Sequence, residues 1–164
     1  MRLGEPRADA FRAGLGAFAD LGAKLQEATV LSLLADVELI DGRRDEALAA
    51  VERGLALAAE TGFGLGRPRL LRLRGDALAE TDSTQAASAY REALSAAGAQ
   101  GSRAIALMAA LALAKLLRST GEAAEAHAVL SDALKGFAPT LLFPEIAEAE
   151  MAMSWVRLRD EYAA

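Results

Sequence analysis

One arrangement of residues returns along this chain at intervals of 39 or 40 positions. At Val51-Gly54-Leu55 a large apolar residue is followed three positions later by a small residue and then by a second large one. The same order occurs 40 positions earlier, 39 positions later and a further 40 beyond that, at Phe11-Gly14-Leu15, Tyr90-Ala93-Leu94 and Leu130-Ala133-Leu134. Residues three or four apart share one face of a helix. Periods of 20–50 residues are typical of stacked helical repeats.

A second kind of helix is predicted between these copies. It is marked by a small residue that returns after 40 and then 39 positions, at Ala35, Gly75 and Ala114. Glycines such as Gly42, Gly62 and Gly121 supply the intervening stops. No alternating strand pattern occurs, so we predict an all-α fold of about eight helices. Their expected ranges are 6–20, 23–40, 44–61, 67–80, 83–98, 102–118, 122–136 and 144–160.

The repeats predict a single helical-repeat domain over residues 1–164. The domain would contain a leading half-repeat, three helix-pair repeats and a final capping helix, at 6–20, at 23–61, 67–98 and 102–136, and at 144–160 respectively. A chain of 164 residues is long enough to bury one core.

Composition excludes several classes of function. The net charge of −5 argues against a nucleic-acid binder, because such proteins are usually basic. Without cysteine the chain has no disulfide and no thiolate chemistry. The N-terminus lacks the apolar segment of a secretory signal. The uncharged apolar stretch Ile105–Ala114 is far shorter than the roughly 20 residues that cross a bilayer. We expect a soluble, cytoplasmic protein without membrane association.

The spacing of the small residues resembles that of the tetratricopeptide repeat (TPR). In each matching segment an alanine is followed four positions later by a large residue, and three positions after that by a small one. The segments are Ala47-x3-Val51-x2-Gly54, Ala86-x3-Tyr90-x2-Ala93 and Ala126-x3-Leu130-x2-Ala133. The period exceeds the usual 34 residues or so, and the first-helix Trp and Tyr of the consensus are missing. The resemblance implies a right-handed α-solenoid of TPR-like antiparallel helix pairs.

Longer stretches are similar to the C-terminal helical tails of large bacterial signalling regulators, of the cyclase/AAA-ATPase type or the LuxR type. These stretches are LRLRGDALAE, AASAYREALSAAGAQGSRAIALMAALALAKLLRSTGEAAEAHAVL and GFAPTLLFPEIAEAE. The resemblance implies a correspondence to the tail alone. The chain has no GxxxxGK[ST] phosphate loop, so the ATPase and cyclase activities of such proteins are not carried over to any residue here.

No reactive constellation stands out in the sequence. The glycine-rich segment Gly62–Gly66, followed by Arg67 and Arg69, is expected to be a turn between repeats, with anion binding as the alternative. One histidine, His127, makes a poor metal site in a chain without cysteine, and we interpret it as a structural residue. We therefore expect no enzyme activity, no catalytic residue, no metal and no cofactor.

A partner-binding groove is the main functional expectation. In TPR-like folds the first helix of each pair lines a concave groove, so positions around Ala35, Gly75 and Ala114 are predicted to face it. The candidates are Thr29, Ser32, Asp36, Arg69, Arg72, Asp76, Met108, Lys115 and Arg118. This set predicts a groove of mixed charge, basic toward its middle and C-terminal part, that would hold an acidic or C-terminal peptide segment. The alternative for Arg72 and Asp76, four residues apart, is an ordinary ion pair on a helix surface.

The two ends of the chain suggest self-association. A repeat stack needs polar caps, yet the first helix carries Phe11, Leu15 and Phe18, and the last carries Trp155. Either the chain is cut from a longer protein, or one copy stacks head-to-tail on the next.

Together these patterns predict a non-enzymatic helical-repeat scaffold that mediates protein–protein interaction or regulation in a bacterial signalling protein. Two alternatives are a small-molecule sensor with its ligand near Arg69, Arg72 and Lys115, and a structural protein that assembles through its ends.

Overall fold

The computed structural model describes residues 5–62, 64–137 and 144–162, and the side chains of 7–62, 64–137 and 144–153 within them. Within these ranges the chain forms α-helices and one 3-10 turn, and no strand, which confirms the all-α prediction. The helices are α1 (Glu5–Asp20), α2 (Lys24–Ile40), α3 (Arg44–Thr61), α4 (Arg67–Leu78), α5 (Ser83–Ala99), α6 (Arg103–Ser119), α7 (Ala123–Leu134) and α8 (Pro144–Tyr162). The 3-10 turn, η1 (Gly64–Gly66), lies in the segment that the sequence predicts to be a turn between repeats.

Local chemistry accounts for the helix ends. Gly62 ends α3 with a φ of 67°, a left-handed conformation that glycine adopts at no steric cost. Pro68 lies in the first turn of α4, where its missing N–H leaves no helical hydrogen bond unmade. The carboxylate of Asp82 caps α5 by accepting a hydrogen bond from the backbone N–H of Gln85 at 2.9 Å. The repeat units are therefore separated by turns whose residues favour a stop.

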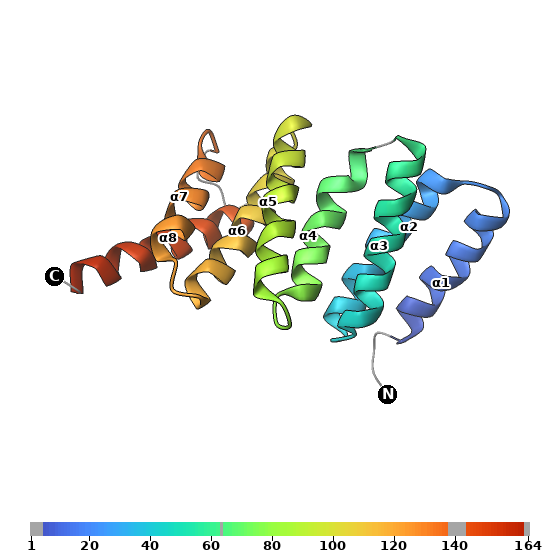
Figure 1. Ribbon diagram of the computed structural model, residues 1–164, viewed down its shortest axis with the longest axis horizontal. Helices are drawn as coiled ribbons and strands as arrows, with labels where there is room; N and C mark the ends of the chain where they lie inside the picture. The colour runs from blue at the N-terminus through green and yellow to red at the C-terminus, as the bar shows by residue number, and fades with distance from the viewer. Residues whose placement is uncertain (1–4, 63, 138–143, 163–164) are drawn as a thin grey trace.

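The helices form a row in chain order, with α1 and α8 at opposite ends (Figure 1). Each helix packs against the next one in the chain. The even-numbered helices also contact one another, α2 with α4, α4 with α6, and α6 with α8. Among the described residues, no pair of Cα atoms within 8 Å joins α1 to α3, α3 to α5 or α5 to α7. The even-numbered helices therefore lie closer together than the odd-numbered ones.

The predicted small residues occupy matching places in the packing. Ala35, Gly75 and Ala114 are buried on α2, α4 and α6, respectively. The first alanine of each TPR-like segment, on α3, α5 and α7, is fully buried as well. These residues are Ala47, Ala86 and Ala126.

Large residues lie against the small ones, as the repeat pattern predicts. A Cβ atom added to Gly75 would come within 2.3 Å of the Tyr90 ring, and one added to Gly54 within 2.9 Å of the Leu70 side chain. Real Cβ atoms essentially never approach other atoms this closely, so the packing of the rigid Tyr90 ring depends on the missing side chain of Gly75, whereas the end of the flexible Leu70 side chain at Gly54 could shift. The prediction that neighbouring helices meet through small-against-large contacts is confirmed at these two sites.

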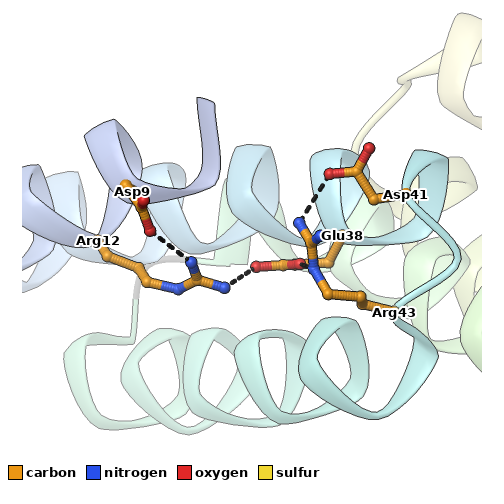
Figure 2. A network of polar contacts seen from close by, with 5 residues as sticks. All are labelled: Asp9, Arg12, Glu38, Asp41 and Arg43. Carbon is orange, nitrogen blue, oxygen red and sulfur yellow. Dashed lines mark hydrogen bonds and ion pairs between the residues drawn. The ribbon is translucent and has the colours of Figure 1, made fainter. Parts of the chain in front are cut away.

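An ion-pair network holds the first two helices together (Figure 2). Glu38 of α2, only 1% exposed, accepts hydrogen bonds from Arg12 of α1 and from Arg43 at the start of α3. Asp9 and Asp41 complete the network, at 2.9 Å from Arg12 and 2.7 Å from Arg43. Hydrogen bonding to Glu38 raises the pKa of Arg43, so the guanidinium stays charged. A buried carboxylate is stable here because two arginines neutralise it.

The face of α1 that was predicted to await an end-to-end partner is turned inward instead. Leu15 is 6% exposed and belongs to the core formed with α2, α3 and α4. Phe11 packs against the same core and Phe18 is half-buried. The expectation is corrected, because the periodicity of a single helix does not say which of its neighbours the apolar face meets. Trp155, the other end-contact candidate, lies outside the described side chains.

Candidate functional site

A hollow of about 550 Å³ lies on the surface between α4, α6 and α8. Four of the nine predicted groove residues line it: Arg72, Asp76, Met108 and Lys115. They come from α4 and α6, two even-numbered helices in direct contact. Residues far apart in the chain therefore meet at one place.

The α4 wall of the hollow is a chain of polar contacts. The Asp76 carboxylate pairs with Arg72 and accepts a hydrogen bond from the Tyr90 hydroxyl at 2.8 Å. Arg72 also reaches Asp36 of α2, 3.5 Å away, and Asp36 pairs with Arg69. The Arg72–Asp76 pair expected as the alternative is thus present, but within a larger network. With an exposed fraction of 14%, the Arg72 side chain belongs to a wall and not to an open surface.

Burial is the main cause of the shifted pKa values of Asp76 and Tyr90 in this wall. Burial raises the pKa of Asp76 above its ordinary value, while Arg72 and the hydrogen bond from Tyr90 act in the opposite direction. Burial and the Asp76 carboxylate both raise the pKa of Tyr90, so its hydroxyl stays neutral and can donate. Arg72 and Tyr90 therefore both have Asp76 as a partner within the wall.

The opposite wall carries more negative charge than the sequence predicts. Lys115 of α6 pairs with Glu148 of α8, with Nζ and Oε1 2.6 Å apart, and Glu145 lines the hollow beside them. Glu145 has no ion-pair partner among the described residues. Two cationic and three anionic side chains therefore line the hollow, for a formal charge of −1. The expected basic character of this part of the groove is corrected, because α8 contributes two carboxylates.

A smaller hollow of about 280 Å³ lies between α2 and the start of α4. Three further groove candidates line it: Thr29, Ser32 and Arg69. Both hydroxyls bond within α2, Thr29 to the carbonyl of Leu25 at 3.1 Å and Ser32 to that of Thr29 at 2.8 Å. The hollow is mainly apolar, because the exposed side chains of Leu25, Leu33 and Leu65 also line it.

Two groove candidates line neither hollow. Asp36 lies between the hollows, where it pairs with one arginine from each lining, Arg69 and Arg72. Arg118 is exposed on α6 and lies outside both linings.

Sequence reasoning missed Tyr90, Glu145 and Glu148. Tyr90 belongs to an odd-numbered helix, and its ring reaches the hollow because Gly75 leaves room for it. The glutamates belong to α8, which was interpreted as a cap. A further interval of 39 residues after Ala114 falls on Met153, which is not a small residue. The repeat spacing therefore does not predict which residues of α8 face α6.

The other sequence candidates show no reactive arrangement. The arginines near Gly62–Gly66 are paired, Arg67 with Glu92 at 3.9 Å and Arg69 with Asp36. His127 is half-buried on α7. Within the described ranges, no three histidine, cysteine or carboxylate side chains lie close enough together to hold a metal ion. None of the helices in these ranges combines the length and apolar character that a membrane crossing needs.

Comparison with known proteins assigns no family. No protein-family model matches the chain, and no curated protein matches its sequence. The hollows offer apolar walls, paired charges and, among the described residues, one carboxylate without an ion-pair partner, Glu145.

Proposed function

We propose that this chain is a non-enzymatic helical-repeat scaffold that binds a peptide segment of a partner protein. In this proposal the helix pairs form a right-handed, TPR-like solenoid, and its even-numbered helices make the concave binding surface. The observation that carries the proposal is the meeting of Arg72, Asp76, Met108 and Lys115 at one hollow of about 550 Å³.

The packing suits a surface that binds by shape. Contacts among α2, α4, α6 and α8 hold this side of the domain in a fixed spacing. The ion pairs that cross between helices, such as Asp36 with Arg69, fix the side chains as well. A surface that is ordered before binding loses little conformational entropy when a peptide docks.

The cellular context is part of the proposal. The likeness of residues 71–80, 86–130 and 136–150 to the tails of bacterial regulators supports a cytoplasmic role in signalling, with the partner being another protein or another region of a regulator.

A peptide selection tests the proposal. We would select peptides from a random display library against the immobilised chain and measure their affinity by fluorescence anisotropy. Ala112→Trp fills the hollow, because Ala112 lines it. The matched control, Ala128→Trp, adds the same side chain at an exposed position of α7.

The expected result is that selected peptides bind the wild type and the Ala128→Trp control alike and lose at least about tenfold in affinity for Ala112→Trp, which corresponds to about 1.4 kcal/mol. Circular dichroism melting verifies that both variants are folded. Failure to select any peptide, or equal binding by both variants, would contradict the proposal.

A small-molecule sensor is the second candidate, and the volume of the hollow favours it. About 550 Å³ lies within the 300–1,000 Å³ of typical ligand pockets. Screening a metabolite library by thermal melting tests this role, since a ligand bound only to the native state raises the melting temperature. A shift abolished by Ala112→Trp would favour the sensor, and no shift across the library would remove it.

A further inference from the structure

We infer that the hollow between α4, α6 and α8 takes a lysine or arginine side chain of the partner peptide, with its cationic end against Glu145 and Glu148. This inference rests on the proposed function and names the chemistry of its ligand. It reverses the acidic preference that the sequence predicts for the groove.

The charges of the hollow favour a cation. Both carboxylates that face Arg72 already neutralise it, Asp36 at 3.5 Å and Asp76 in closer contact. Lys115 is likewise paired, with Glu148. An incoming carboxylate would have to break these pairs and would meet Glu145. An incoming cation meets Glu145 without breaking any pair among the described residues, and charge-assisted hydrogen bonds of this kind are strong.

The apolar part of the hollow suits the stem of such a side chain. Met108, Leu111 and Ala112 of α6 line it together with the carboxylates of α8. Lysine and arginine bury their methylene stems along apolar surface while the charged group remains at a polar edge. A ligand side chain can therefore use both kinds of surface at once.

The second hollow indicates that the cation is part of an extended segment. The apolar hollow with Leu25, Leu33 and Leu65 lies next along the even-numbered helices. Arg69 lines that hollow, Arg72 lines the larger one, and both pair with Asp36 between them. A peptide carrying an apolar residue at some distance from a basic one would fill both hollows.

A positional peptide library tests the inference. One position at a time is fixed as Lys, Arg, Leu or Glu, and binding to the full chain is measured by fluorescence anisotropy. We expect Lys or Arg to be favoured at one position and Glu to be disfavoured there. The combined variant Glu145→Gln and Glu148→Gln should lose this preference, by about tenfold in the ratio of Lys to Glu affinities. Glu150→Gln, an exposed carboxylate of α8 outside the hollow, is the matched control and should keep it.

Lys115→Met provides a change in the opposite direction. It frees Glu148 from its ion pair, so peptides with Lys at the favoured position should bind more tightly than they bind the wild type. A preference for Glu, or a Lys preference that survives Glu145→Gln with Glu148→Gln, would overturn the inference.

The outcomes separate the inference from the proposed function. If peptides bind and Ala112→Trp weakens them, but no position favours Lys or Arg, the inference is wrong and the scaffold remains. If no peptide binds, both are wrong.

Discussion

The ring of Tyr90 lies against the backbone of Gly75. A methyl group on Gly75 would come within 2.3 Å of Cε1 and 2.5 Å of Cδ1 of that ring. The same ring directs its hydroxyl to Asp76, the residue next to Gly75. One glycine therefore permits both the packing of α5 on α4 and the polar wall of the larger hollow.

Gly75→Ala is expected to lower the free energy of unfolding by about 1–2 kcal/mol. Overpacking a core costs about 1–3 kcal/mol, and alanine recovers up to about 1 kcal/mol through helix propensity. Gly54→Ala is the matched comparison, because the nearest atom there is the end of the flexible Leu70 side chain. We expect Gly54→Ala to be near neutral by urea denaturation. Equal losses for the two variants would contradict the packing described for Tyr90.

Glu38→Gln is expected to destabilise the protein by about 1.5–3 kcal/mol. The variant removes the charge that Arg12 and Arg43 share while keeping the shape of the side chain, and hydrogen bonds to charged groups contribute about this much. Glu46→Gln, at an exposed position of α3, is the control and should change little. Urea denaturation measures both variants, and a neutral Glu38→Gln would show that the network does not hold α1 in place.

The stabilisation that Asp82 provides as the N-cap of α5 should depend on pH. Hydrogen bonds from Gln85 lower the pKa of Asp82 below its ordinary 3.8. The folded state therefore favours the carboxylate, so its contribution is present above pH 3.8 and is lost as pH falls through the lowered pKa. Melting temperatures of wild type and Asp82→Asn should differ most near neutral pH and converge in strong acid.

The contribution of Asp76 to stability should change with pH in the opposite direction to that of Asp82. Burial raises its pKa, so its protonation favours the fold, and the wild type should gain stability relative to Asp76→Asn as pH falls through the raised pKa. Differences that stay constant with pH for both variants would contradict the described environments of these two carboxyls.

The repeat spacing was sufficient to predict the helices and the places where small residues are buried. It placed Ala35, Gly75 and Ala114 in matching buried positions, because a small residue is needed wherever two helices approach closely. The ends of α4 and α7 fall two residues earlier than predicted, at Leu78 and Leu134. Helix ends depend on weak local preferences, so they are harder to predict than helix existence.

The candidate site was harder to predict, because charge at a site depends on neighbours from other helices. In the sequence, Arg69 and Arg72 suggest a basic groove. In the structure, Asp36 of the neighbouring helix α2 pairs with both arginines and neutralises part of this charge. Glu145 and Glu148 enter the hollow through the orientation of α8, which the repeat does not encode.

The unequal spacing of the two helix layers has a mechanical consequence. In the part of the chain that the structure describes, each even-numbered helix contacts the next even-numbered one, whereas the odd-numbered helices do not contact one another. Bending the domain would therefore change the gaps between α1, α3, α5 and α7 more than the gaps on the opposite side. The even-numbered layer would then act as the neutral axis of an elastic strip. A segment lying along it would keep its length and register while the outer layer stretches or compresses.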